Sequence, residues 1–299
     1  MRAEVLMVRL VSLWLLPAIA VLLLVGCGDP VPTDYQEELV VEGFVFVGEP
    51  ISDIRVLRTL PITDTFRFVD ASIRDAQVRI TADGVPLPVE YVSDSLGGTY
   101  RVAAQQYRAV SGVTYAIEVI AAGKTVTGST TTPDTLSWVK APKDTLQYPG
   151  RLFELTRNDS LEVGWTAVPG VGQYVVAVEC LDTLGYGQYL SPATTDSNRR
   201  IRDQDRFDDG TLIANERVRF GFSILTRAPT VWSVFKWFGK QEIRVYAGDL
   251  AFQEWFRMVG FGRRSSYDYR LSNIKGGLGT WGSASLIRKS TFLKMDQIK

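Results

Sequence analysis

"TYAIEVIAAGKTVTGSTT", residues 114–131, is the stretch that decides the fold. In its first half, Tyr115, Ile117, Val119 and Ala121 place apolar side chains at every second position, and in its second half Val126 stands among polar residues. This fits the period-two pattern of a half-buried β-strand. Ala122, Gly123 and Lys124 separate the halves and are typical of a tight turn. The stretch therefore predicts a hairpin of two antiparallel strands.

Similar short segments precede this hairpin. They read "LVVEGFVFV", "IRVLRT", "AQVRITADG", "LPVEYVSD" and "GTYRVA", and turn residues separate them. Closely spaced short strands favour an antiparallel β-sandwich. Pro133 cannot donate to a strand ladder and precedes a new apolar strand, so we expect the first sandwich to occupy residues 39–134.

A second β domain is expected over residues 135–299. Its opening, "LEVGWTAVPGVGQYVVAVE", resembles two strands of a fibronectin type III domain, with Trp165 and Tyr174 as expected core aromatics. A long polar insertion follows at about residues 184–210, and strands resume with "RVRFGFSILT" and "QEIRVYAG". The predicted fold class is therefore mainly β, with two immunoglobulin-like or fibronectin III-like antiparallel sandwiches.

One amphipathic helix is predicted in the second domain. Phe252, Trp255, Phe256 and Val259 recur with helical spacing, and Asp249 precedes them as an N-cap. Glycines at positions 260 and 262 mark its expected end. We expect the aromatic stripe to pack onto the second domain, with Trp255 and Phe256 buried.

The N-terminal stretch predicts export and lipidation. Two arginines precede an apolar run that is shorter than the roughly 20 residues of a membrane-spanning helix, and this layout predicts a signal peptide over residues 1–26. Leu24-Val25-Gly26-Cys27 then resembles the lipobox of bacterial lipoproteins. The resemblance implies a lipid on Cys27 and a tether over residues 27–38, with a single-pass membrane anchor as the alternative.

The composition argues against several classes of protein. Lysines and arginines number 33, as do aspartates and glutamates, so no basic excess points to a nucleic-acid partner. The chain has no histidine, which removes the Ser–His and Cys–His catalytic sets and zinc sites that use histidine. Cys180 lies in the apolar stretch "QYVVAVECLD" and is expected to be a buried, unreactive thiol.

Two segments imitate nucleotide-binding motifs. "GLGTWG", residues 277–282, fits the glycine pattern of dinucleotide-binding folds, but no continuous buried strand precedes it and a strand-like segment follows. We expect a glycine-rich turn or bulge that leads into the last strand. "AAGKT" resembles the end of a phosphate-binding loop, but Glu118 stands where the first glycine is required. The sequence therefore predicts no cofactor.

Acidic residues suggest one weak metal site. Asp205, Asp209 and Glu216 match three positions of the calcium-loop pattern, whereas Phe207 offers no side-chain oxygen at another. A solvated acidic turn is the favoured interpretation, and a calcium site is the alternative.

The segment "VWSVFKWFG", residues 231–239, is apolar on both faces whether it is read as a strand or as a helix. It fits a buried core element, a patch that faces a protein, or a platform for stacking on a sugar or another ligand. Trp232, Phe235, Trp237 and Phe238 are the candidate contacts to a partner.

Several stretches resemble one protein family. They include "VVEGFVFVGEP", "VRITADG", "GGTYRV", "FDDGT" and, most specifically, "SNIKGGLGTWGSAS". These stretches resemble a lipoprotein family of Bacteroidota known as a domain of unknown function, whose genes often lie near TonB-dependent outer-membrane receptors. Trp281 stands at an aromatic position where Phe is expected more often. The resemblance implies an outer-membrane setting and brings no catalytic residues with it.

Two functions of different classes follow. The resemblance implies an accessory or ligand-binding partner of a TonB-dependent receptor, anchored to the membrane through Cys27. The alternative is a surface hydrolase of glycans or peptides that uses carboxylates, which a chain without histidine can still assemble. Asp29, Asp34, Glu37 and Glu38 follow the lipid site. Because lipoproteins of Bacteroidota often reach the cell surface through acidic residues at this place, the resemblance implies surface display rather than a periplasmic location.

Overall fold

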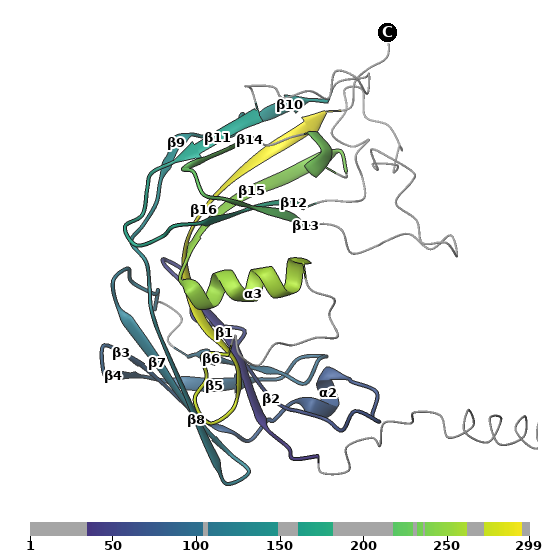
Figure 1. Ribbon diagram of the computed structural model, residues 1–299, viewed down its shortest axis with the longest axis vertical. Coiled ribbons are helices and arrows are strands. Elements are labelled where there is room, and N and C mark those ends of the chain that lie inside the picture. Colours follow the sequence, from purple (N-terminus) through teal and green to yellow (C-terminus); the bar gives the residue numbers. More distant parts are fainter. Residues whose placement is uncertain are drawn as a thin grey trace, which may run out of the picture. The chain divides into compact units, whose positions relative to one another are not determined.

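Segments that alternate in polarity form strands in the computed structural model (Figure 1). The structure describes residues 35–103, 107–148, 161–181, 218–229, 232–235, 237–261 and 272–294. Contacts divide the chain into one unit of residues 1–37 and a second, compact unit of residues 38–299, which holds every element below. The predicted mainly β class is confirmed. Among the described residues, no helix is long and apolar enough to cross a membrane.

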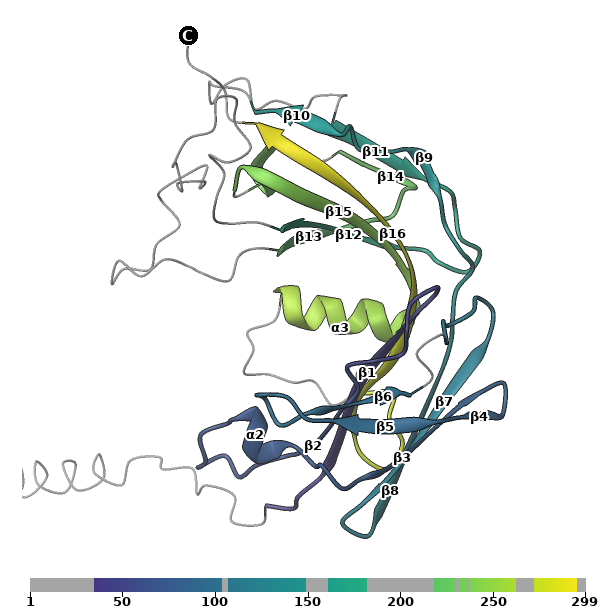
Figure 2. The ribbon, with the colours of Figure 1, turned by 180° about the vertical axis from the view of Figure 1, so that it is seen from behind.

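The largest sheet joins β1 and β16, which come from opposite ends of the described chain. Its main path is β13 (Val218–Ser223), β12 (Tyr174–Cys180), β15 (Gly239–Gly248), β16 (Leu278–Lys294), β1 (Leu39–Phe46) and β2 (Arg55–Arg58). The seventh strand, β10 (Thr145–Gln147), pairs with the end of β16. Figure 2 shows β16, in yellow, running along β1 and then along β15.

Three smaller sheets and the short helices complete the fold. One sheet has the order β4 (Val85–Leu87), β3 (Gln77–Ala82), β7 (Thr114–Ala121) and β8 (Lys124–Thr131). The second pairs β5 (Val89–Val92) with β6 (Thr99–Val102), and the third has the order β14 (Arg227–Pro229), β11 (Glu162–Trp165) and β9 (Trp138–Lys140). The helices within the described residues are α2 (Phe68–Ala71), η4 (Trp232–Val234) and α3 (Leu250–Phe261).

The pairing differs from the purely antiparallel arrangement that the sequence suggested. Strands β1 and β10 both run parallel to β16, while the remaining pairs of named strands are antiparallel. Strand β1 belongs to the first predicted domain and β16 to the second, so the two predicted ranges share one sheet. Independent folding of residues 39–134 and 135–299 stays a prediction.

The hairpin at residues 114–131 forms as predicted. Strands β7 and β8 pair from Thr114 with Thr131 to Ala121 with Lys124. Ala122 and Gly123 form the turn, with φ of 48° and 72°. Positive φ at both central positions is the geometry of a two-residue hairpin turn whose twist matches that of its strands.

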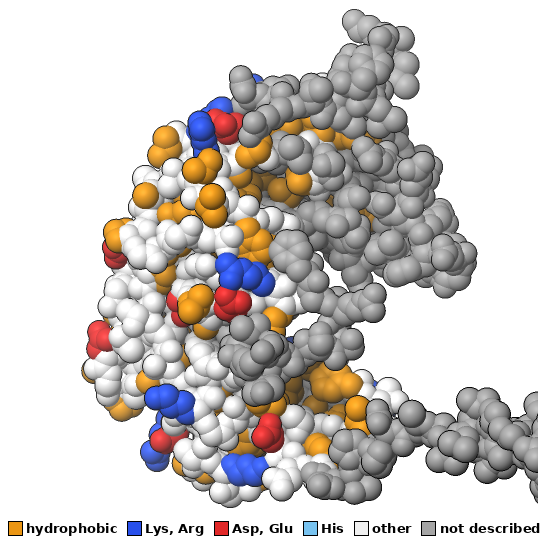
Figure 3. Space-filling view, viewed as in Figure 1, with side chains coloured by type: hydrophobic (Ala, Val, Ile, Leu, Met, Phe, Trp, Pro, Cys, Tyr) orange, Lys and Arg blue, Asp and Glu red, His pale blue; other side chains and the backbone are white. Residues whose placement is uncertain are grey.

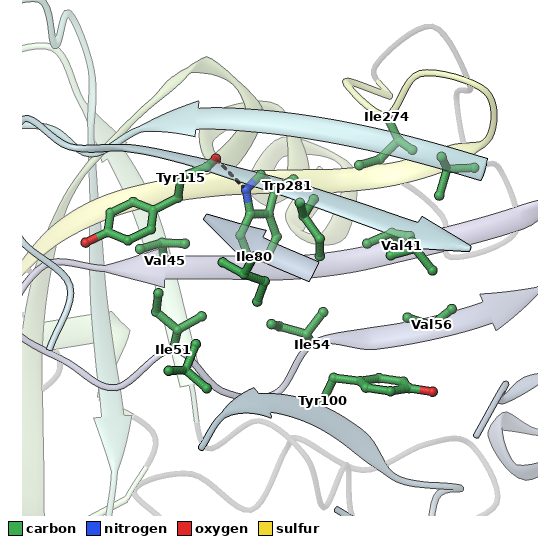
Figure 4. Close-up of a cluster of buried hydrophobic side chains, with 14 of the residues drawn as sticks. Val41, Val45, Ile51, Ile54, Val56, Ile80, Tyr100, Tyr115, Ile274 and Trp281 are labelled. Atoms are coloured by element: carbon green, nitrogen blue, oxygen red, sulfur yellow. Dashed lines mark hydrogen bonds between the residues drawn. The ribbon is translucent and has the colours of Figure 1, made fainter. Parts of the chain in front are cut away.

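The first core lies between β1, β16 and the sheet that holds the hairpin (Figure 4). Alternate residues of β1, such as Val41 and Val45, point into this core because successive side chains of a strand face opposite sides. Trp281 of β16 is fully buried there, and its indole N–H donates to the carbonyl oxygen of Tyr115 at 2.9 Å. The segment "GLGTWG", which imitates a dinucleotide-binding motif, lies within strand β16 from Leu278 onward rather than in a turn before the strand.

The fibronectin-like aromatics fill a second core. Trp165 on β11 and Tyr174 on β12 are both buried, and their ring centroids lie 5.4 Å apart in an edge-to-face arrangement. The two strands belong to different sheets, so this aromatic pair joins the layers of a sandwich. Their prediction as core residues is confirmed. Cys180, at the end of β12, is buried as predicted.

Helix α3 forms where the sequence predicts it, and Asp249 caps its N-terminus by accepting a hydrogen bond from the backbone N–H of Phe252 at 2.8 Å. Phe252 is buried, whereas Trp255 and Phe256 are only half-buried, which corrects the expectation of full burial. The helix packs on the large sheet and contacts β1 as well as the predicted second domain, since Phe44 and Phe252 lie 5.6 Å apart between ring centroids.

Candidate functional site

Two sites predicted from the sequence lie outside the described residues. They are the lipid site at Cys27 and the weak calcium candidate at Asp205, Asp209 and Glu216. Both stay predictions, as does the alternative hydrolase, whose carboxylates could come from the polar insertion at about residues 184–210 or from the ends of strands. Within the described ranges, no group of three His, Cys, Asp or Glu residues is placed to hold a metal ion.

The aromatic segment that was the candidate partner contact is largely core. Trp232, Phe235 and Phe238 are buried in a cluster with Tyr148, whose ring lies 5.5 Å from that of Phe238. Only Trp237 of the four candidates is half-buried. Rings that pack against their own chain cannot reach a partner in this state. This burial corrects the candidate contact at Trp232, Phe235 and Phe238 and favours the core interpretation of the segment.

A hollow of about 480 Å³ lies on the outer face of the sheet β3-β7-β8. The opposite face of this sheet covers the first core, so buried residues such as Ile80 and Val119 support the floor of the hollow from below. Backbone hydrogen bonds between Thr127 and Lys275 extend the sheet beyond β8 and place Lys275 at the rim. The hollow is therefore carried by a regular ladder with a packed core beneath it.

We call this hollow the sheet-face hollow. Hydroxyl and charged side chains line it together with the apolar side chains of Ala116 and Ile117. Thr81, Thr127 and Ser129 supply hydroxyl groups to the lining. Arg79 on β3 and Glu118 on β7 form an ion pair across the strands with an N–O distance of 3.4 Å. Lys275 adds an exposed ammonium group. This combination suits hydrogen bonding to a polar ligand or to a polar segment of another protein.

A second hollow, of about 510 Å³, forms where the end of β8, the 169–172 turn and the start of α3 meet. Two carboxylates, Asp134 and Asp249, line it. Asp249 is the more buried of the two, and burial raises the pKa of its carboxyl group, although hydrogen bonds from Thr130 and from the Phe252 N–H oppose the shift.

Asp249 belongs to a network of hydrogen bonds internal to the fold. One of its oxygens accepts the Phe252 N–H, and the other accepts the Thr130 hydroxyl at 2.5 Å. The Thr130 oxygen also lies 2.6 Å from the hydroxyl oxygen of Ser283, which is buried on β16. Asp249 therefore ties α3, β8 and β16 together.

Comparison with known proteins places the chain in a family. Residues 29–249 match the model of the family described as Domain of unknown function (DUF4249). The chain belongs to the DUF4249 family. No curated protein matches it. A solved structure of an I-band fragment of titin is similar at 8% identity and a TM-score of 0.21, over 87% of this chain and 65% of that fragment. A TM-score this low does not establish a shared fold.

The DUF4249 match begins before β1 and ends at Asp249. It therefore includes β1 to β15 and leaves out α3 and β16. The segment "SNIKGGLGTWGSAS" carries the most specific part of the family resemblance described above, and it lies beyond the matched range. That segment nevertheless supplies the strand that pairs with β1 and completes the first core.

Burial of two carboxylates predicts a pH effect on the stability of this DUF4249 protein. The pKa of Asp249 and that of Glu42, whose carboxylate accepts the Trp255 indole N–H at 2.7 Å, are both raised by burial. A raised pKa means that the folded state holds the proton to a higher pH than the unfolded chain does. The ordinary pKa is 3.8 for Asp249 and 4.5 for Glu42. As the pH rises from this ordinary pKa through the raised pKa of the folded state, each carboxyl group lowers the free energy of unfolding.

Asp249→Asn and Glu42→Gln retain an acceptor oxygen but cannot ionise. Relative to wild type, the free energy of unfolding of each variant should rise as pH increases from about 4 to 7, because only wild type takes up the penalty of ionising a buried acid. Urea unfolding at a series of pH values measures this difference. A difference that stays constant over that range contradicts the raised pKa values.

Sequence reasoning did not identify the sheet-face hollow. Arg79 and Glu118 are 39 positions apart and read as ordinary exposed residues of two strands. The signal in the sequence was that both residues stand at outward-facing positions of strands whose inward-facing positions are apolar. Their direct pairing depends on the register of β3 with β7, which the sequence pattern alone does not determine.

Proposed function

We propose that the chain is a non-enzymatic lipoprotein of the outer membrane that acts as an accessory or ligand-binding partner of a TonB-dependent receptor. The observation that carries the proposal is the apolar run that ends in Leu24-Val25-Gly26-Cys27. Two or three acyl chains on Cys27 anchor a protein stably without spanning the membrane. The resemblance to lipoproteins of Bacteroidota supports the same setting, and the acidic residues after Cys27 favour the cell surface.

We assign the partner contact to the sheet-face hollow rather than to the aromatic segment at 231–239. Hydroxyl and charged side chains line the hollow beside apolar ones, its floor is a regular ladder, and the Arg79–Glu118 pair places two opposite charges on it. A surface held in place before binding loses little conformational freedom when a partner arrives. Charged groups at such a surface mainly determine which partner fits and how fast it associates.

Anchoring strengthens even a weak contact. A tether keeps the protein in the plane of its receptor, and the effective concentration of tethered partners reaches about the millimolar range. A small polar interface therefore remains occupied on the membrane although the same interface between free proteins dissociates. The sheet-face hollow can therefore serve as a binding site on the membrane.

The hydrolase alternative has one observation in its favour, since Asp134 and Asp249 line one hollow. An acid–base pair requires a carboxyl group that can exchange its proton with a substrate. Both oxygens of Asp249 already accept hydrogen bonds from Thr130 and from the helix α3. We therefore assign Asp249 to the helix cap and propose no hydrolysis at this position.

Crosslinking in intact cells tests the proposal. Wild-type protein should fractionate with the outer membrane and crosslink to a TonB-dependent receptor, while Cys27→Ser protein should leave the membrane fraction. Arg79→Glu with Lys275→Glu reverses two charges at the hollow and should reduce the crosslinked yield about tenfold or more, as expected for the loss of a charge-complementary contact.

Arg101→Glu is the matched control. Arg101 is also a partly exposed arginine in a cross-strand ion pair, with Glu90 at 2.8 Å, but it lies on β6, away from the hollow. This variant should crosslink like wild type. The partnership is wrong if no receptor is captured, and the assignment to the hollow is wrong if both charge variants crosslink equally.

A further inference from the structure

Apolar side chains gather on the surface in the loop between β2 and β3. Ile62, Phe66, Phe68 and Val69 are 84%, 56%, 38% and 41% exposed, and Leu96 of the neighbouring turn is 46% exposed. The rings of Phe66 and Phe68 contact each other with 5.1 Å between centroids. Figure 3 shows hydrophobic side chains on the surface over α2. These five residues are called the apolar loop patch.

The backbone beneath the patch is fixed by hydrogen bonds. The Ser72 hydroxyl lies within hydrogen-bonding distance of the carbonyl oxygens of Phe68, at 2.7 Å, and Leu96, at 3.2 Å, which joins α2 to the 94–98 turn. Asp94 closes that turn by accepting the backbone N–H groups of Leu96 and Gly98. The exposed side chains therefore stand on an ordered support.

Gly97 shows how closely the two segments approach. Its φ is +108°, and a Cβ atom at this position would lie 2.6 Å from Cβ of Ser72 and 3.3 Å from Cα of Val69. Only glycine fits this contact. Gly97 thus allows the 94–98 turn to pack tightly against α2, while the apolar side chains of both segments remain exposed to solvent. Large exposed apolar patches are uncommon on monomeric proteins.

The patch lies next to the point where the chain enters the folded unit. Glu38 and Thr59 exchange two hydrogen bonds, each of 3.0 Å, and Ile62 follows three residues after Thr59. The segment from Cys27 to Glu38 spans at most about 40 Å even when fully extended, because a residue adds no more than about 3.6 Å. A lipid on Cys27 therefore keeps Glu38 within about 40 Å of the bilayer, and Ile62 of the patch lies three residues beyond the Thr59 that pairs with Glu38.

We propose that the apolar loop patch inserts into the headgroup region of the bilayer to which Cys27 anchors the chain. This inference rests on the proposed lipid anchor. Aromatic and aliphatic side chains beside arginines suit this region, where one part of a contact is apolar and the other is hydrated. Insertion adds a second attachment to the acyl chains and fixes the orientation of the folded unit on the membrane.

The charges around the patch indicate what kind of lipid surface it fits. Arg67 pairs with Asp70 at 2.6 Å and Arg55 with Asp94 at 3.4 Å, and the Arg55 guanidinium also lies 5.5 Å from the centre of the Phe68 ring. Because these cations are paired, attraction to anionic lipids contributes little. The contact should therefore form on zwitterionic membranes and resist salt.

A spin label tests the insertion in the full-length lipoprotein reconstituted in vesicles. Ile62→Cys is labelled and compared with Val139→Cys, a site on β9 that is also strongly exposed and apolar, at 73%. Cys180 is buried and Cys27 carries the lipid, so the label reports the chosen position. Accessibility of the label to oxygen, which concentrates in lipid, is measured against accessibility to a water-soluble nickel complex.

At position 62 the ratio of oxygen to nickel accessibility should shift toward oxygen on vesicles, while at position 139 it should stay aqueous. The shift should be equal in pure phosphatidylcholine and in equal parts phosphatidylcholine and phosphatidylglycerol. Adding Phe66→Ser and Phe68→Ser, two exposed positions, should return the label at 62 to water.

Each other result has a distinct meaning. Protein that does not float with the vesicles refutes the lipid anchor, and with it this inference. Protein that floats while both labels report water refutes the insertion alone. A label at 62 that becomes immobile only when a receptor is present, and not in vesicles, shows that a protein covers the patch and overturns the proposal.

Discussion

Gly279→Ala is expected to separate strands β1 and β16 and to lower the free energy of unfolding by about 3 kcal/mol or more. Gly279 has φ of +120°, and a Cβ atom there would lie 1.9 Å from the carbonyl oxygen of Val41. The opposing atom belongs to the backbone of the paired strand, so no side-chain rotation relieves the clash. The two strands have to move apart, and the parallel ladder between them is lost.

Gly84→Ala separates the effect of conformation from the effect of contact. Gly84 also has positive φ, +82°, but a Cβ atom there meets nothing within 4 Å. Its replacement should lower the free energy of unfolding by only about 1 to 2 kcal/mol, the strain of left-handed backbone in a non-glycine residue. Urea unfolding of both variants measures the two values. Equal losses at positions 84 and 279 contradict the close approach of β16 to β1.

Local features of the fold could be predicted from the sequence. The hairpin at 114–131 was predictable because its apolar spacing and its turn residues all lie within 18 consecutive positions. Helix α3 was predictable for the same reason, since Asp249 and the aromatic stripe lie within three turns of one another. The aromatic pair Trp165 and Tyr174 was predictable from a motif of two strands.

Pairing between distant segments could not be predicted. Strands β1 and β16 are separated by more than 200 residues, and each reads as an ordinary strand by itself. Their parallel register depends on close contacts at Gly277 and Gly279, which only the assembled pair displays. A period-two pattern says which face of a strand is buried but not which strand lies beside it. The pattern therefore did not reveal that residues on both sides of position 134 share one sheet.

The two candidate binding surfaces could not be predicted either, because each depends on segments that are distant in the sequence. The segment at 231–239 is apolar on both faces, so its pattern favoured a core element but also fitted a partner contact or a stacking platform. Only the positions of Tyr148 and Leu293, which come from other parts of the chain, reveal the pocket that buries Trp232 and Phe235. The sheet-face hollow, in turn, is lined by ordinary strand residues, polar and apolar, whose individual positions carry no signal of binding.

Trp281→Ala is expected to lower the free energy of unfolding by about 3 to 5 kcal/mol, as other buried Trp→Ala changes do. The indole is fully buried in the first core, and its N–H pairs with the Tyr115 carbonyl oxygen. Asn273 also holds this position, because its side-chain amide bonds both the N–H and the carbonyl oxygen of Trp281. Trp281→Phe keeps most of the ring and should lose only about 1 to 3 kcal/mol, through the missing hydrogen bond and a smaller cavity.

A double-mutant cycle with Gly43 tests whether the indole ring itself shapes the strand pair. A Cβ atom on Gly43 of β1 would lie 2.7 Å from Cζ3 of Trp281, and the buried, hydrogen-bonded indole has no room to move away. Gly43→Ala should therefore be destabilising in wild type and less so beside Trp281→Phe, whose shorter ring vacates that space. The coupling energy should be about 0.5 to 3 kcal/mol in favour of the double variant. Additive losses would show that the indole does not determine which residue β1 accepts at position 43.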